Sequence, residues 1–277
     1  MLSKTQIDHF ATFGFVVLRD HLAEQTLPLR EEVDAAIKDA YAATYEDRVI
    51  DGISGHYLPM ASRLTPTSAS LVCDDRLIDA ADDLLGGAVI PECPEGVLYF
   101  DEAGWHNDDG IGVHGVKFAT YFDQLGAGNG ALRLVPGSHH PEQHARLVAY
   151  RSAHMPISTD AEAAAYQASF PGYIADTAPG DVIAFDLHTW HASTGGHDRL
   201  AWTVVYQRCP ETDAERERTL RSIKDSFEQE FRGFDRERYP IWRDWLADAD
   251  SHPERAPIIE RMRAAGVLDL PGVEIGW

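Results

Sequence analysis

Short β-prone segments separated by Gly- and Pro-rich turns most constrain the fold of this chain. The turns include GAGNG at 126–130, PGS at 136–138 and PGD at 179–181. Many short strands with such turns between them indicate an antiparallel sandwich or jelly roll. The predicted core strands cover residues 96–100, 116–122, 131–135, 182–186 and 200–206. We therefore expect a mainly β fold with flanking helices: a double-stranded β-helix, the jelly roll of cupin-like proteins.

Both ends of the chain have helical patterns instead. The predicted helices cover residues 3–12, 22–44, 76–85 and, in a highly charged tail, 211–265, and a strand is predicted at 15–18. Ser3 is a suitable N-cap, and Gly86-Gly87 is a typical stop signal. The expected organisation is one domain over 1–277, with a β core at about 90–207 and mostly helical flanks at 1–89 and 208–277.

Charge excludes some classes of partner. The 277 residues carry a formal net charge of -21, with a pI of about 4.8. Nucleic acids and anionic membranes need clustered Lys and Arg, so neither is an expected partner. No apolar run is long enough for a membrane helix, and the N-terminus does not look like a signal peptide. A small-molecule substrate remains, and the oligomeric state, monomer or homodimer, is left open.

Cysteine usage gives a further limit. The three cysteines, Cys73, Cys93 and Cys209, are odd in number and form no CxxC pair. A disulfide framework or a structural zinc site is therefore not expected, and a reducing cytoplasm fits best.

The chemistry of the chain is concentrated around Trp105-His106-Asn107-Asp108, which follows a predicted strand. In extended backbone, residues i and i+2 point to the same side, so His106 and Asp108 should converge. An imidazole beside a carboxylate makes two thirds of the facial triad that holds non-haem Fe(II). Alone, such a pair is common and is a weak signal.

A third ligand must come from a distant segment. After the turn at 179–181 and a short apolar strand come His188 and His191, and either could coordinate a metal. Further on, Arg199 comes directly before the predicted strand at 200–206. A planar guanidinium near a metal is suited to bidentate capture of a carboxylate.

Taken in order, these motifs resemble the phytanoyl-CoA dioxygenase family of Fe(II)/2-oxoglutarate-dependent oxygenases. The resemblance extends over about residues 5–207 and rests on four segments: His106-x-Asp108, residues 129–139, residues 179–181, and His191-x-Ser193 followed by Arg199. It implies Fe(II), 2-oxoglutarate and O2 as cofactor and cosubstrates. The spacing from the PGD turn and the His-x-Ser pattern favour His191 over His188.

The resemblance also implies residue roles. His106, Asp108 and His191 would bind the metal and form the catalytic centre. Arg199 and Ser193 would hold the distal carboxylate of 2-oxoglutarate, and the strand at 116–122 would line that pocket. Within it Lys117 would contact 2-oxoglutarate or substrate.

Some residues near these motifs are not expected to bind the metal. Trp105 and Trp190 should pack around the site, and His139 should not be a ligand. Related halogenases carry a small residue where this chain has Asp108, so hydroxylation, desaturation or cyclisation is expected instead of halogenation.

The substrate is not readable from the sequence. We expect the variable regions 45–75, 107–116 and 140–178 to form its pocket. The suggested lining residues are Arg63, His114, Arg133 and Trp202. A small intermediate of natural-product biosynthesis is the favoured class. Two alternatives stay open at this point: a cupin-like metalloenzyme that does not use 2-oxoglutarate, and a non-catalytic jelly-roll protein whose histidines are merely packed.

Overall fold

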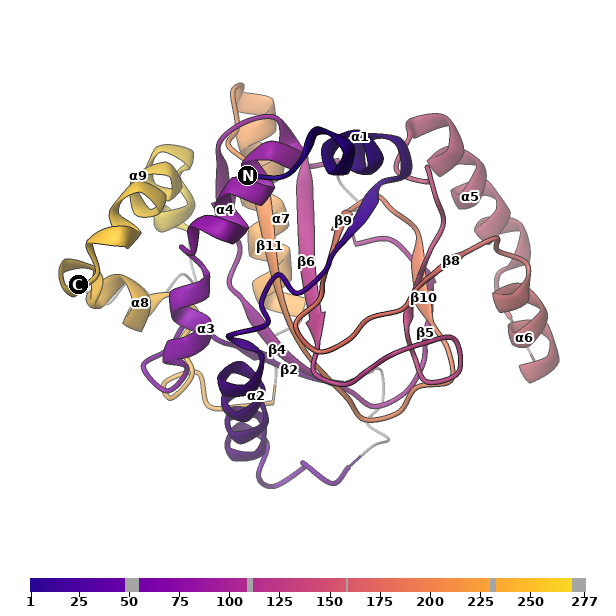
Figure 1. Ribbon diagram of the computed structural model, residues 1–277, viewed down its shortest axis with the longest axis horizontal. Coiled ribbons are helices and arrows are strands. Elements are labelled where there is room, and N and C mark those ends of the chain that lie inside the picture. Colours follow the sequence, from indigo (N-terminus) through magenta and orange to yellow (C-terminus); the bar gives the residue numbers. More distant parts are fainter. Residues whose placement is uncertain (48–54, 109–111, 158, 230–232, 271–277) are drawn as a thin grey trace.

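Antiparallel strands from the middle of the chain form two facing sheets in the computed structural model (Figure 1), which describes residues 1–47, 55–108, 112–157, 159–229 and 233–270. The strands are β1 (Phe15–Leu18), β2 (Gly55–Pro59), β3 (Val89–Pro91), β4 (Glu95–Tyr99), β5 (Ala103–His106), β6 (Gly115–Tyr121), β7 (Leu132–Leu134), β8 (Tyr173–Ala175), β9 (Val182–Asp186), β10 (His191–Ser193) and β11 (Arg199–Arg208). The larger sheet has the order β1-β9-β6-β11-β4-β2, with β3 paired to the end of β11. The smaller sheet has the order β5-β10-β7-β8. This arrangement confirms the predicted jelly roll.

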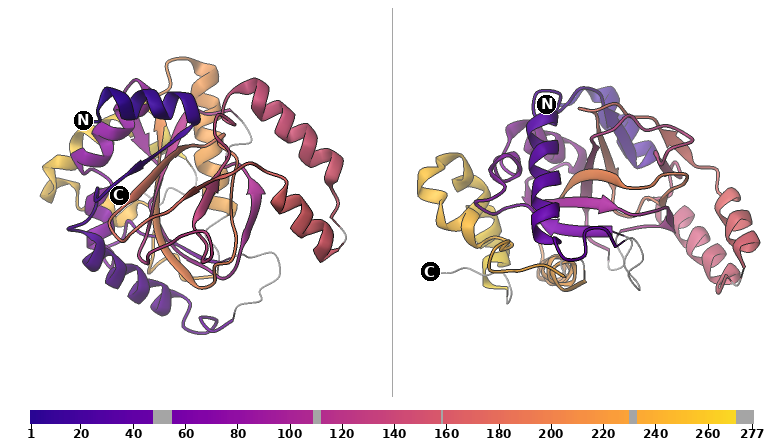
Figure 2. Two further views of the ribbon diagram at one scale, coloured as in Figure 1. Left: turned by 45° about the vertical axis from the view of Figure 1, so that its right-hand side comes forward. Right: turned by 90° about the horizontal axis from the view of Figure 1, so that it is seen from below.

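Helices cover the outer faces of both sheets. They are α1 (Lys4–Phe13), α2 (Thr26–Ala40), α3 (Pro66–Leu71), α4 (Asp75–Leu85), α5 (Pro141–His154), α6 (Asp160–Ala168), α7 (Asp213–Gln229), α8 (Arg243–Ala247) and α9 (Ala256–Ala265), with short 3-10 turns at Ala249–Ser251, Pro253–Arg255 and Val267–Asp269. Helices α5 and α6 lie beside the smaller sheet, and α3, α4, α8 and α9 lie on the opposite side of the molecule (Figures 1 and 2). Among the described residues, no helix is long and apolar enough to cross a membrane.

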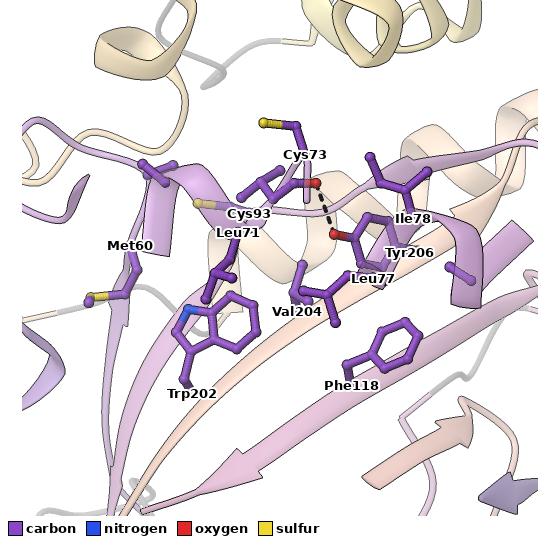
Figure 3. Packing of buried hydrophobic residues seen from close by; sticks show 14 of the residues in the cluster. Met60, Leu71, Cys73, Leu77, Ile78, Cys93, Phe118, Trp202, Val204 and Tyr206 are labelled. Atoms are coloured by element: carbon purple, nitrogen blue, oxygen red, sulfur yellow. Dashed lines mark hydrogen bonds between the residues drawn. The ribbon is translucent and has the colours of Figure 1, made fainter. Parts of the chain in front are cut away.

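Alternate residues of the central strand β11 face opposite ways. Trp202, Val204 and Tyr206 point outward into the main hydrophobic core beneath α3 and α4 (Figure 3). Two polar contacts fix this layer: the Trp202 indole N–H donates to Ser68 Oγ at 2.7 Å, and the Tyr206 hydroxyl donates to the Val72 carbonyl at 2.9 Å. Residues of odd number on β11 face the space between the sheets, where a polar cavity lies.

A separate aromatic cluster packs under α5 and α6. Trp105 and Trp190 are 3% and 1% exposed and lie there with Phe170 and Tyr166. The Trp105 and Phe170 rings stack at 4.7 Å. Both tryptophans therefore point away from the neighbouring histidines, because adjacent residues in extended backbone face opposite sides. They pack in this cluster and do not line the cavity around which they were expected to pack.

The predicted elements differ from the observed ones in specific places. Strands β1 and β9 have the predicted bounds, and α4 ends at Gly86, whose φ of 66° is in the left-handed region. The tail at 211–265 was predicted as helical, but it is not one continuous helix. It is divided into α7, α8 and α9. Strands β2, β3, β5, β8 and β10 were not predicted, since each has only three to five residues.

Candidate active site

A cavity of about 310 Å³ opens between the two sheets. Its walls come from β2, β4, β6, β9 and β11 of the larger sheet and from β5, β7 and β10 of the smaller one. The lining residues are Tyr57, Tyr99, Ala103, His106, Asn107, Asp108, Lys117, Ala119, Tyr121, Leu132, Phe185, His191, Ser193, Arg199 and Thr203. All six residues singled out from the sequence as metal or cosubstrate ligands are in this set.

His106, Asp108 and His191 meet at one end of this cavity. His106 and His191 are direct cross-strand partners of β5 and β10, and their ring centroids are 4.2 Å apart. Asp108 Oδ1 is 3.6 Å from His106 Nε2 and 3.5 Å from His191 Nε2. Backbone pairing thus brings together residues 85 positions apart, by subtraction of their residue numbers. Their ligand atoms all lie within 4.8 Å of one another.

Backbone carbonyls orient both imidazoles. His106 Nδ1 is 2.7 Å from the Gly104 carbonyl oxygen, and His191 Nδ1 is 2.9 Å from the Thr189 carbonyl oxygen. A carbonyl oxygen only accepts, so each Nδ1 carries the proton and donates. Each Nε2 then presents a lone pair towards the cavity, the tautomer that metal-binding histidines adopt.

Charge around Asp108 keeps it ionised. Burial alone would raise the pKa of Asp108, but Lys117 and the two imidazoles outweigh burial and hold the pKa well below its usual range. Lys117 Nζ lies 3.2 Å from Asp108 Oδ2. Burial, with help from His106, lowers the pKa of His191 to about 4. A neutral imidazole and a carboxylate are the forms that bind a metal.

These donors fit a ferrous ion. Two neutral imidazole nitrogens and one carboxylate oxygen approach from one side, and the opposite side faces open cavity. The facial triad of non-haem iron has this donor set.

Arg199 lies at another part of the same cavity, and two carbonyls hold its guanidinium. Nη1 donates to the Gly130 carbonyl at 3.0 Å and Nη2 to the Asp101 carbonyl at 2.8 Å. The guanidinium also lies 5.1 Å from the Tyr99 ring centroid. Nε is buried without a partner among the described residues. A guanidinium has five N–H donors, so donors remain for a carboxylate.

Glycine at position 130 is required by this arrangement. Its φ is 92°, a left-handed conformation that other residues rarely adopt. A Cβ there would lie 2.5 Å from Arg199 Cδ. The 129–130 turn therefore does more than connect strands, because it leaves the room through which Arg199 reaches the cavity.

Ser193 and Tyr121 complete this part of the cavity. Ser193 is 2% exposed, and its Oγ accepts the Ala103 amide proton at 3.2 Å. Among the described residues, no acceptor takes the Ser193 hydroxyl proton, which is available for an anion. Burial raises the pKa of Tyr121, although the nearby Arg199 acts in the opposite direction. Tyr121 thus keeps a donor hydroxyl close to Arg199.

His188, the alternative ligand, points elsewhere. Its Nδ1 lies 2.9 Å from Asp186 Oδ1, and it does not line the cavity. In the part of the chain that is described, the one group of potential ligands is His106, Asp108 and His191. His139 is likewise outside this group, in agreement with the expectation.

The suggested substrate-lining residues were wrong. Trp202 is 1% exposed and faces the outer core, because the odd-numbered residues at this part of β11 face the cavity and the even-numbered ones do not. Arg63 is exposed beside Asp244, and Arg133 stacks over Trp105. His114 lines a separate pocket of about 90 Å³.

The sequence analysis missed three tyrosines of the cavity wall. Tyr57, Tyr99 and Tyr121 come from β2, β4 and β6, and the ring centroid of Tyr99 lies 5.9 Å from that of Tyr57 and 6.5 Å from that of Tyr121. For Tyr99 and Tyr121 the signal was present, since each belongs to a predicted strand. Tyr57 could not be found in this way, because β2 lacks a clear strand pattern.

Comparison with known proteins places this site in a family. Residues 10–199 match the sequence profile described as phytanoyl-CoA dioxygenase (PhyH). The chain belongs to the phytanoyl-CoA dioxygenase family. Membership decides between the alternatives left open by the sequence: this family member is a non-haem iron dioxygenase that depends on 2-oxoglutarate.

Curated relatives are similar over most of the chain. The ectoine dioxygenase of Bordetella parapertussis is 24% identical over 217 residues, which is 69% of this chain and 70% of that protein. The L-proline trans-4-hydroxylase of Streptomyces griseoviridis is 30% identical over 173 residues, or 53% of this chain and 65% of that protein.

Solved structures show the same fold. EctD from S. alaskensis with bound Fe has a TM-score of 0.55 at 23% identity, covering 75% of this chain and 77% of its own. The carbocyclase SnoK from nogalamycin biosynthesis has a TM-score of 0.58 at 20% identity, covering 75% and 85%. Another EctD structure contains 2-oxoglutarate and 5-hydroxyectoine.

Proposed function

We propose that this enzyme hydroxylates, or otherwise oxidises, a small biosynthetic intermediate at the end of the cavity formed by His106, Asp108 and His191. These three residues would hold Fe(II). The observation that carries the proposal is that two Nε2 lone pairs and one carboxylate converge in the same cavity as Arg199. When bound, iron supplies the oxidation of the substrate by O2, coupled to decarboxylation of 2-oxoglutarate to succinate and CO2.

Arg199 and Ser193 would bind the distal carboxylate of 2-oxoglutarate. The free N–H donors of the guanidinium and the Ser193 hydroxyl support this assignment, because both lie in the cavity wall and are buried. Lys117 would contact 2-oxoglutarate or substrate while it fixes the outer oxygen of Asp108. Two carbonyl bonds to Arg199 limit its rotation, so little entropy is lost when the carboxylate binds.

The carboxylate at Asp108 supports oxygen transfer, desaturation or ring closure as the outcome. The relatives include enzymes named for dioxygenation, hydroxylation and carbocycle formation. Residues 1–277 would act as one oxygenase domain. In support, Ile258 and Met262 of the C-terminal part lie in the same core cluster as Leu77 and Val89.

An anaerobic titration with Fe(II) and 2-oxoglutarate tests the proposal. Wild-type protein should develop the weak visible charge-transfer band of a chelated keto acid. His191→Ala should abolish the band, whereas His188→Ala, the control histidine, should retain it. Arg199→Ala should weaken 2-oxoglutarate binding by roughly 10-fold or more, since bonds between charged groups are worth about 1.5–3 kcal/mol; the exposed Arg63→Ala should not.

The absence of any band from wild-type protein would contradict the proposed function. Loss of iron binding in His188→Ala but not in His191→Ala would show that the other histidine is the ligand. Succinate release across a panel of small molecules then identifies the substrate.

A further inference from the structure

A second, smaller cavity adjoins the first at the metal-binding end. It has a volume of about 70 Å³ and is lined by Glu92, Cys93, Glu95, Asp108, Lys117, Leu187, Thr203, Val205, Ser222 and Ser226. Three residues, Asp108, Lys117 and Thr203, line both cavities. A molecule held in the small cavity would therefore be next to the proposed iron ligand Asp108.

The small cavity lies away from the 2-oxoglutarate anchor. On the ladder between β4 and β11, Arg199 pairs with Tyr99, and Thr203 pairs with Glu95. These pairs are four residues apart, roughly 13 Å along a strand. The proposed cosubstrate anchor and the small cavity thus occupy opposite ends of the same sheet face, and Asp108 lies at the end nearer to Glu95.

Glu95 lines this cavity, and one of its two carboxylate oxygens accepts no hydrogen bond from the described residues. It is 8% exposed, and the Thr203 hydroxyl donates to its Oε2 at 3.1 Å. Among the described residues, no donor reaches Oε1, and no basic side chain forms an ion pair with Glu95. Burial of a carboxylate is costly unless it is paired and hydrogen-bonded. Glu95 Oε1 is open to the cavity, so it can accept a hydrogen bond from a ligand held there.

Glu92, its neighbour, differs in this respect. It is also 8% exposed, but both oxygens accept from the protein. Gln207 Nε2 donates to Oε1 at 2.5 Å, and the Ser226 hydroxyl donates to Oε2 at 3.0 Å. Glu92 is therefore part of the wall that connects β11 to α7, and the two glutamates form a matched pair for experiment.

The charge of the small cavity favours a cation. It is lined by three carboxylates, Glu92, Glu95 and Asp108, and by one lysine. Lys117 already lies 3.2 Å from Asp108. Clustered charge of one sign in a low-dielectric recess attracts the opposite charge. Glu95 thus faces a cavity of about 70 Å³, which has room for one small cationic group.

We propose that Glu95, positioned by Thr203, binds a protonated nitrogen of the substrate and so places a nearby carbon beside the iron. The substrate class is then a small amine, amino acid or amidine. This inference rests on the proposed function, because it takes the triad of His106, Asp108 and His191 as the place of oxidation.

Matched compounds test this proposal on the Fe(II)- and 2-oxoglutarate-loaded enzyme. Short amines, amidines and amino acids are compared with analogues in which a hydroxyl replaces the nitrogen. Succinate release should be stimulated by the nitrogen compounds at roughly tenfold lower concentration than by their hydroxyl analogues. Glu95→Gln should remove this preference by raising the concentration of amine needed roughly 10- to 100-fold.

Controls separate charge recognition from folding. Glu92→Gln should reduce the preference for nitrogen compounds much less than Glu95→Gln does, because both oxygens of Glu92 already accept hydrogen bonds from the protein. Thr203→Val keeps the carboxylate but removes its hydrogen bond, so the preference should be weaker but still present. This variant also serves if Glu95→Gln fails to fold, and a fully retained preference in Thr203→Val would then contradict the positioning of Glu95.

The two proposals fail in different ways. If the charge-transfer band forms but no nitrogen compound in the panel is preferred, the inference about Glu95 is wrong and the oxygenase assignment stands. The inference about Glu95 is also wrong if Glu95→Gln retains the wild-type preference. If the band does not form, the assignment of the metal site itself is wrong.

Discussion

The two faces of the larger sheet are built from the same strands and have different tasks. On β11, Trp202 and Tyr206 face outward into a packed core, and each uses its polar atom in a single buried hydrogen bond. Arg199 and Thr203 on the same strand face the cavity. Arg199 retains N–H donors for a ligand, and Thr203 donates a hydrogen bond to the cavity residue Glu95. The outward-facing polar atoms of Trp202 and Tyr206 are paired within the protein, whereas the inner face leaves some donors for ligands. Stability and chemistry should therefore be separable by changing neighbouring residues.

Trp202→Ala should give the largest effect and test the outer face. Removal of the buried indole from beneath α3 should lower the free energy of unfolding by about 3–5 kcal/mol, because the core cannot close the void. Urea denaturation measures this. Under conditions where the variant is folded, its affinity for 2-oxoglutarate should be close to that of wild type. Trp202→Phe, which fills more of the space, should lose much less stability.

His106→Ala makes the complementary change on the inner face. Fe(II) affinity should fall by more than about 100-fold, because loss of a direct ligand should exceed the roughly 10- to 100-fold cost of losing a group that merely supports one. The free energy of unfolding should change by less than about 1 kcal/mol, since the side chain is 40% exposed and makes one hydrogen bond, to Gly104. A large loss of stability in the metal-free variant would contradict the separation of the two faces.

Gly130→Ala should have a smaller effect and refine the comparison. The new methyl group would push Arg199 from its position, so 2-oxoglutarate affinity should fall by about tenfold, the value of one hydrogen bond to a charged group. Gly128→Ala is the control from the same turn, because a Cβ at that position meets nothing within 4 Å. Equal affinities in the two variants would show that the space at Gly130 does not control Arg199.

Local patterns were sufficient for part of the site. The i, i+2 relation placed His106 and Asp108 together without any knowledge of distant contacts. The role of Arg199 came from the family resemblance, and the structure places its side chain in the cavity wall. Family resemblance was needed to choose His191, because the sequence offers His188 with equal local merit.

Strand phase and pairing were not accessible from local patterns. Residues 200–206 are apolar on nearly every position, so no alternation showed that Trp202 points outward and Thr203 inward. Strand β10 has three residues and exists because it lies between β5 and β7. Glu95 was missed for a related reason, since a carboxylate at the start of a strand looks exposed until Asp108, Leu187 and α7 enclose it.

The direct pairing of His106 with His191 has a consequence for engineering. Hydrogen bonds of the small sheet set the separation of the two imidazoles, so connecting segments do not determine it. Loops grafted from other oxygenases to change the substrate should therefore leave the relative positions of the two iron-binding imidazoles unchanged. Insertions within β5 or β10, by contrast, would shift the register and turn one imidazole to the opposite face.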